Sequence, residues 1–205
     1  MHRVSTIFRY FVMMNDLFKN KYRIAPARLQ TWDYAGQGAY FITICTQNRE
    51  CYFGEIRHME LHLSPLGEVA HNEWIKSETL RPDMNLELGE FIIMPNHVHG
   101  IIYIGENQYN ARRDAMHRGS ETPTNTPFTS INSAVNKFGP QSKNLSSIIR
   151  GFKSAVTTYA RKNNLDFSWQ TRFHDRIIRT PDECMKISEY IINNPYHWKK
   201  DEFYK

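Results

Sequence analysis

Two histidines, His97 and His99, stand one residue apart where a turn meets an apolar strand. Successive side chains of a strand alternate between its faces, so both imidazoles point to one face and Val98 points to the other. Two imidazoles on one face can bind one metal ion or one phosphate. Because the pair follows the Pro95-Asn96 turn, we expect it at the rim of a sheet, where sites are commonly built. A surface strand that merely carries two histidines is the alternative interpretation.

A second pair, Tyr159 and Asn163, is four residues apart in a predicted helix, so the two side chains are neighbours on one helix face. An amide is a poor core residue without partners, which favours a functional role for Asn163. Tyr159 alone could be an ordinary core aromatic. If this helix faces the histidine strand, the four side chains supply a nucleophile together with nitrogen and oxygen ligands. Such a mixed ligand set suits a divalent ion, Mg²⁺ or Mn²⁺.

Positive charge is concentrated in one segment of the 205-residue chain. Residues 145–179 contain seven basic and two acidic residues, whereas the rest of the chain contains 19 of each. The whole formal excess of +5 therefore lies in this segment. Such clustering favours a polyanion-binding surface, with a solvated helix face as the alternative. The candidate contacts are Arg150, Lys153, Arg161, Lys162, Arg172 and Arg176.

Hydrophobic periodicity, together with the residues that begin and end helices and strands, predicts the elements that position these side chains. Strands are predicted over residues 40–46, 86–94, 98–104 and 173–178, with a shorter one over 59–63. Helices are predicted from the Ser64-Pro65 start to about residue 80, over 145–164, and from Pro181 to about 194. This order predicts an α+β fold, with one antiparallel sheet and helices on one face.

Length and composition fit a single domain over residues 21–205, preceded by a poorly ordered extension over 1–20. Residues 105–144 lack periodicity and are predicted to form a mobile insertion. The three cysteines have no metal-like spacing, which predicts reduced packing residues in a cytoplasmic protein. No apolar run reaches the roughly 18 residues of a membrane span, so we expect no membrane partner.

These residues carry a resemblance to a known family. His97-Val98-His99 resembles the His–hydrophobic–His motif of the HUH endonucleases, and Tyr159 with Asn163 resembles the nucleophile helix of their single-tyrosine transposases. From about residue 21 to 198 the chain is similar to the REP-associated tyrosine transposases, with supporting matches over 94–99, 151–154, 169–175 and 190–195. The resemblance implies a ferredoxin-like HUH endonuclease fold.

The same resemblance implies metal-dependent cleavage and strand transfer of single-stranded or hairpin DNA, as in DNA transposition or the processing of REP hairpins. A metal held by His97, His99 and Asn163 would polarise a phosphodiester, and Tyr159 would attack it to form a 5′-phosphotyrosine bond. The basic segment would hold the DNA backbone. The long insertion before the tyrosine helix departs from the family pattern, which leaves open a homodimer that exchanges this helix. His174 is another candidate for a polar contribution.

Two other functions fit the same residues. A cleavage-inactive regulator that binds DNA hairpins would use the basic segment equally well. A metal-dependent phosphoesterase would use water as the nucleophile and leave Tyr159 in a structural role. Covalent capture of an oligonucleotide separates the transposase from both alternatives.

Overall fold

The structure is a computed structural model that describes residues 34–110 and 142–204. The predicted N-terminal extension, 1–20, and most of the predicted insertion, 105–144, lie outside the described residues. The first residues of that insertion are described, and there Asn107 Nδ2 donates a hydrogen bond to the Met84 carbonyl oxygen at 3.0 Å. The described residues belong to one unit of the chain.

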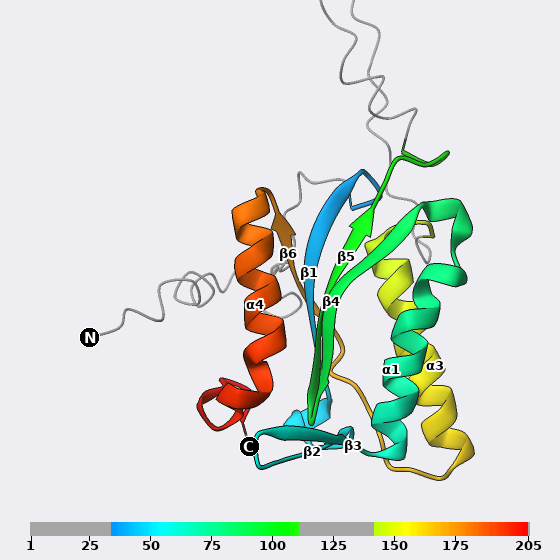
Figure 1. The fold of residues 1–205 in the computed structure, drawn as a ribbon. Helices are drawn as coiled ribbons and strands as arrows, with labels where there is room; N and C mark the ends of the chain where they lie inside the picture. Colours follow the sequence, from blue (N-terminus) through cyan, green and yellow to red (C-terminus); the bar gives the residue numbers. More distant parts are fainter. Residues whose placement is uncertain (1–33, 111–141, 205) are drawn as a thin grey trace, which may run out of the picture. The chain divides into compact units, whose positions relative to one another are not determined.

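A four-stranded antiparallel sheet in the order β4-β5-β1-β6 lies at the centre (Figure 1). The two central strands pair from Gly38 opposite Ile104 to Cys45 opposite His97. A smaller sheet pairs β2 with β3. The strands are β1 (Gly38–Cys45), β2 (Gly54–Arg57), β3 (Glu60–Leu63), β4 (Leu86–Met94), β5 (His97–Ile104) and β6 (His174–Ile178).

Side-chain caps fix where the three main helices begin. Ser64 Oγ accepts a hydrogen bond from the Gly67 backbone N–H at 3.1 Å, with Pro65 at the first helical position, as predicted. Asn144 and Thr180 cap the other two helices in the same way. The helices are α1 (Pro65–Thr79), α3 (Leu145–Lys162) and α4 (Pro181–His197), with short 3₁₀ turns η3 (Gln47–Arg49), η4 (Pro82–Met84) and η5 (Trp198–Lys200).

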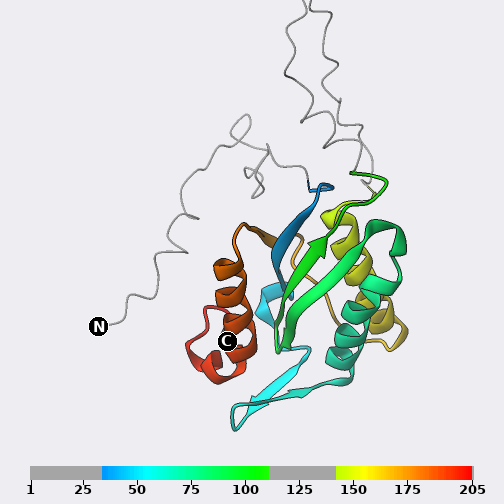
Figure 2. The same ribbon diagram turned by 45° about the horizontal axis from the view of Figure 1, so that its top comes forward.

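The helices cover both faces of the sheet, with α1 and α3 on one face and α4 on the other (Figures 1 and 2). Alternation along β5 shows this directly. A Cβ on Gly100 would lie 2.4 Å from Trp74 Cζ2 of α1, whereas Ile101 packs with Ile191 of α4. The predicted α+β fold with an antiparallel sheet is confirmed, but the prediction of helices on one face is wrong. β5 is buried on both faces along most of its length, which requires a covering layer on each side.

Two smaller predictions can also be compared with the structure. Cys45 is buried and Cys184 is half-buried, as expected of packing residues, whereas Cys51 is exposed and does not fit that prediction. No helix in residues 34–110 and 142–204 is long and apolar enough to span a bilayer.

Candidate active site

β5 begins with the histidine pair, His97 and His99, and both side chains face α4. Their ring centroids are 4.4 Å apart. Both are buried, with 0% and 1% of their surface exposed. The two imidazoles therefore lie on one face of the strand, as predicted.

Hydrogen bonds orient the His97 ring. Its Nδ1 lies 2.8 Å from Asn96 Oδ1. The Asn96 Nδ2 group donates to the carbonyl oxygens of Arg49 and Phe203, which directs the amide oxygen toward His97. His97 Nδ1 therefore carries the proton and Nε2 offers a lone pair. That Nε2 atom is buried and has no hydrogen-bond partner among the described residues.

The His99 ring is held in a similar way. Its Nδ1 lies 2.9 Å from Thr43 Oγ1 of the neighbouring strand. One ring nitrogen of each histidine is thus fixed by a neighbour while the other faces the site, the usual arrangement of histidine ligands to metals. The orphaned nitrogen of His97 is the observation that a bound cation would explain.

Burial keeps both imidazoles neutral. Desolvation lowers the pKa of His97 well below its usual value, with smaller contributions from His99 and Arg49. Desolvation lowers the pKa of His99 to about 3. Neutral imidazole is the form that binds metal, so the pair is ready to act as ligands at physiological pH.

Asp201 brings a carboxylate close to the pair. One ligand atom each from His97, His99 and Asp201 lie within 4.8 Å of one another. Asn194 Nδ2 donates to Asp201 Oδ2 at 3.1 Å, while Asn194 Oδ1 is buried without a hydrogen-bond partner in the described part of the chain. Two nitrogens and these oxygens fit a divalent ion such as Mg²⁺ or Mn²⁺. Asp201 was not predicted from the sequence, because no regular spacing connects it to the histidines.

Tyr190 of α4 brings a hydroxyl to the same place. Its Oη lies 3.2 Å from His99 Nε2, and its ring meets the His99 ring with centroids 5.2 Å apart. Burial is the main cause that raises the pKa of Tyr190, and the charge of Asp201 adds to it, whereas a hydrogen bond with Asn194 opposes the rise. Tyr190 and Asn194 are four residues apart, so α4 carries the same Tyr-x-x-x-Asn spacing as Tyr159 and Asn163.

The structure does not bring Tyr159 and Asn163 to the histidine pair. They lie on α3, which packs against α1 on the opposite face of the sheet (Figure 1). Asn163 is the exposed C-cap of α3, and its Nδ2 donates to the Tyr159 carbonyl oxygen at 2.9 Å. Both helices carry matches to the family, over residues 151–154 and 190–195, so these matches did not distinguish the two tyrosines.

The six predicted basic contacts are spread over the molecule. Arg150, Arg161 and Lys162 are exposed on α3, across the sheet from the histidines. Lys153 is half-buried, donates to the Gln170 carbonyl oxygen at 2.5 Å, and has a pKa that burial lowers to about 8. The remaining two lie at or near β6, where Arg172 is exposed and Arg176 forms an ion pair with Glu183 of α4.

Basic residues that the sequence analysis did not select lie closer to the histidine pair. Arg49 follows β1, and its guanidinium carbon lies 5.0 Å from the centroid of the Phe203 ring, which itself packs on His97. Lys199 and Lys200 are exposed on η5, just after α4. Isolated positions of this kind have no pattern in the sequence that would identify them.

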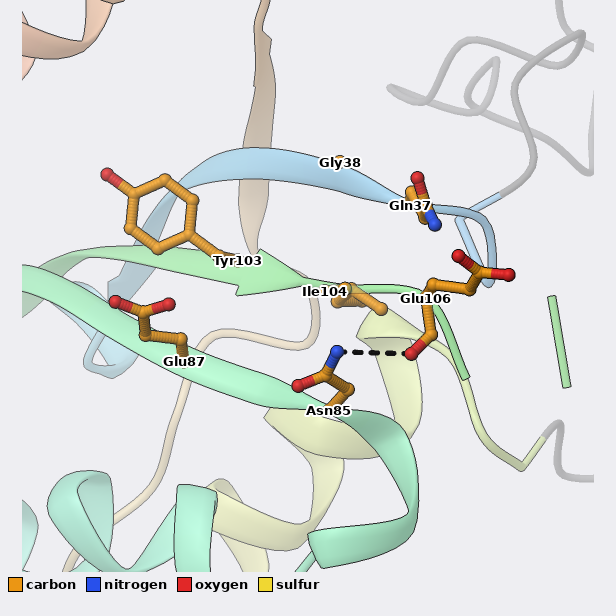
Figure 3. Close-up of a pocket in the computed structure, with 8 residues that line it drawn as sticks. Gln37, Gly38, Asn85, Glu87, Tyr103, Ile104 and Glu106 are labelled. Carbon is orange, nitrogen blue, oxygen red and sulfur yellow. Dashed lines mark hydrogen bonds between the residues drawn. The ribbon is translucent and has the colours of Figure 1, made fainter. Parts of the chain in front are cut away.

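A pocket at the other end of β5 is unrelated to this site. It is lined by Glu87, Tyr103, Ile104 and Glu106, and the Asn85 side chain donates to the Glu106 carbonyl oxygen at 3.1 Å (Figure 3). The two carboxylates make it a poor place for a nucleic-acid backbone.

Comparison with known proteins adds a family and a fold. No family model matches the sequence. A protein of Haemophilus influenzae, described as an uncharacterized protein, is 36% identical over 178 residues, covering 86% of this chain and 91% of its own. The chain belongs to the family of this protein.

Solved structures supply the fold of that family. The REP-associated tyrosine transposase bound to a REP hairpin matches with a TM-score of 0.51 and 19% identity, over 82% of this chain and 73% of its own. The chain therefore has the α+β fold of this HUH-type transposase, as the resemblance predicted. A candidate transposase of Deinococcus radiodurans R1 matches with a TM-score of 0.34 and 14% identity, over 81% of this chain and 95% of its own.

Proposed function

We propose that this protein is a transposase that cleaves and rejoins single-stranded DNA, with Tyr190 as its nucleophile. The observation that carries the proposal is the Tyr190 hydroxyl, 3.2 Å from His99 Nε2 and beside a cluster of metal-ligand atoms. The fold supports this reaction class, and the REP hairpin bound by the structural neighbour supports a hairpin or single strand as the substrate.

The residues that would hold a divalent ion are His97, His99 and Asp201, with Asn194 Oδ1 as a further oxygen. When bound, the ion would polarise the phosphodiester and favour the ionised form of the tyrosine. Asn194 takes the part that the sequence analysis assigned to Asn163. This assignment follows from position, because Asn194 is buried next to Asp201 and Asn163 is exposed on the opposite layer.

The chemistry of the chain itself centres on Tyr190. Its Oη forms a bond to phosphorus and loses its proton, while the bond from phosphorus to the 3′-oxygen breaks and the departing oxygen is protonated to a free 3′-hydroxyl. The product is a 5′-phosphotyrosine link. Because this link keeps the energy of the broken phosphodiester, attack by a 3′-hydroxyl reverses the step without ATP. The pKa of Tyr190 is raised above its usual value, mainly by desolvation, so the phenol is protonated at neutral pH and must lose its proton as it attacks.

The two alternatives make no use of this arrangement. A hairpin-binding regulator needs neither Tyr190 nor the ligand cluster, and a phosphoesterase that activates water needs no tyrosine hydroxyl beside the histidines. The position of Tyr190 is therefore the feature that favours strand transfer.

Covalent capture tests the proposal. Wild-type protein with Mn²⁺ and a labelled single-stranded hairpin oligonucleotide should form an adduct that survives denaturant. Tyr190→Phe removes one oxygen and should abolish the adduct, with a loss of about a thousandfold or more in rate. Tyr159→Phe is the matched control and should form the adduct at the wild-type rate. An adduct that forms normally in Tyr190→Phe, and not in Tyr159→Phe, would return the nucleophile to α3.

A further inference from the structure

The edge strand of the sheet beside the proposed nucleophile is β6, which begins with His174. The registers of two strand pairs place His99 opposite Thr43, and Thr43 opposite His174. Residues directly opposite each other in antiparallel strands project to the same face of the sheet. His174 therefore belongs to the row of side chains that contains His99, on the face toward α4.

This row leads to the reacting atoms of the proposed function. Thr43 Oγ1 lies 2.9 Å from His99 Nδ1, and the Tyr190 hydroxyl lies 3.2 Å from His99 Nε2. Neighbouring strands are about 5 Å apart, so one strand spacing separates the backbones of Thr43 and His174. A phosphodiester that is held at Tyr190 and extends toward β6 comes within reach of the His174 imidazole.

The β6 side of Tyr190 is also its open side. On this face α4 packs mainly against β4, at the opposite edge of the sheet. Tyr190 is 42% exposed and His174 is exposed, whereas His99 is buried. The ring of Phe41, which lies on β1 next to β6, meets the Tyr190 ring edge-on with centroids 6.1 Å apart. A DNA strand can therefore approach Tyr190 from β6.

The charged side chains that β6 presents on this face differ in the chemistry that they allow. Arg176 forms an ion pair with Glu183 of α4, and a guanidinium does not release its proton at physiological pH. Histidine gains and loses a proton near neutral pH, which suits it to general acid–base catalysis. The proposed reaction needs such a donor, because the 3′-oxygen departs most easily when it is protonated.

We propose that His174 is the general acid that protonates the departing 3′-oxygen. This inference rests on the proposed function and names the proton donor of that reaction. The bond from Tyr190 Oη to phosphorus forms as the bond from phosphorus to the 3′-oxygen breaks, and the His174 imidazolium gives its proton to that oxygen. The phenol proton passes to solvent, so the charges of reactants and products balance. In rejoining, neutral His174 removes the proton of the attacking 3′-hydroxyl.

An oligonucleotide with sulfur in place of the departing 3′-oxygen tests this role. A thiolate departs without a proton far more readily than an alkoxide, because thiols are stronger acids than alcohols. On the normal hairpin oligonucleotide, His174→Gln should form the adduct about a hundredfold more slowly than wild type, a typical loss for a general acid. On the 3′-sulfur oligonucleotide, the variant and wild type should form the adduct at similar rates.

Two control variants accompany the measurement. His62→Gln is the matched control, because His62 is an exposed histidine of β3, and it should behave as wild type on both oligonucleotides. Tyr190→Phe should form no adduct with either. A defect of folding or DNA binding in His174→Gln would slow both oligonucleotides equally, so the recovery with sulfur separates proton donation from a structural role.

A wild-type rate for His174→Gln on the normal oligonucleotide would overturn the assignment, and so would an equal loss on both oligonucleotides. Either result, with an adduct in wild type, leaves the chemistry of Tyr190 standing and removes only His174 from it. If wild type forms no adduct with either oligonucleotide, the proposed function fails and the role of His174 fails with it.

Discussion

His97 combines complete burial with a ring nitrogen, Nε2, that has no hydrogen-bond partner among the described residues, whereas Nε2 of the buried His99 lies 3.2 Å from the Tyr190 hydroxyl. The neighbouring strand and turn hold one nitrogen of each ring through Thr43 and Asn96. Burial then keeps both rings neutral. A buried nitrogen without a partner lowers the stability of the fold, and a bound cation would satisfy the Nε2 atom of His97.

The same burial predicts how stability depends on pH. The folded-state pKa of His99 is about 3, below the ordinary value of 6.5 that we expect in the unfolded chain. Between these values the unfolded state binds the extra proton, so the free energy of unfolding falls as pH is lowered from 6.5 toward 3. The decrease should be about 1.4 kcal/mol per pH unit for each such histidine. Urea denaturation with a chelator present, at several pH values, measures it.

The control for this prediction is the double variant His97→Gln, His99→Gln. It lacks both titrating rings, so its stability should depend less steeply on pH over the same interval. Equal slopes for wild type and the double variant would show that other groups cause the acid sensitivity.

At the residue scale, the sequence predicted the histidine pair because strand alternation alone puts the two rings together. It could not select between Tyr159 and Tyr190, since both precede an asparagine by four residues on a helix. That choice depends on which face each helix covers, a property of tertiary packing. Asp201 was missed for a similar reason, because a turn brings it to the site.

The elements themselves were largely predictable. The strand predicted over residues 86–94 is β4, and the predicted Ser64 cap begins α1. β2 was missed because Gly54–Arg57 alternates weakly and contains a glycine and two charged residues. The faces of the sheet were not predictable from periodicity, since an apolar strand such as β5 can be covered on one side or both.

Gly100 gives a test of how β5 packs against α1. A methyl group there would lie 2.4 Å from Trp74 Cζ2. Gly100→Ala should therefore destabilise the protein by about 1–3 kcal/mol through overpacking. Trp74→Phe removes the clashing atom, so the double variant should be more stable than the sum of the two single changes predicts. Urea denaturation of the four proteins measures the coupling, and simple additivity would contradict the described packing of Gly100 on Trp74.

For the whole molecule, the concentrated charge of residues 145–179 does not form one surface. Arg161 and Lys162 lie on α3, and the histidine pair lies beyond the sheet on the other side. Lys199 and Lys200 follow α4, which carries Tyr190. The basic residues of α3 are therefore separated from the histidine pair by the sheet, and a strand bound at Tyr190 meets Lys199 and Lys200, which lie outside residues 145–179, more readily.

The salt dependence of DNA binding can separate these faces. Neutralising one side chain that binds a phosphate should reduce the slope of log affinity against log salt by about 0.7 for a single strand. Lys199→Gln with Lys200→Gln should therefore reduce the slope by up to about 1.4, and Arg161→Gln with Lys162→Gln by less. Titration of a labelled single strand at several salt concentrations measures both. The opposite ranking would place the DNA path on α3.

The central claim is that DNA becomes joined to Tyr190 at the histidine site. Peptide mass spectrometry of the trapped adduct tests it most directly, because trypsin places the two candidate tyrosines in different peptides, residues 187–199 and 154–161. Fragmentation of the first peptide also separates Tyr190 from Tyr196. We expect the nucleotide on Tyr190, and none on the peptide that contains Tyr159. A nucleotide found on Tyr159, or on any other residue, would contradict the proposed mechanism.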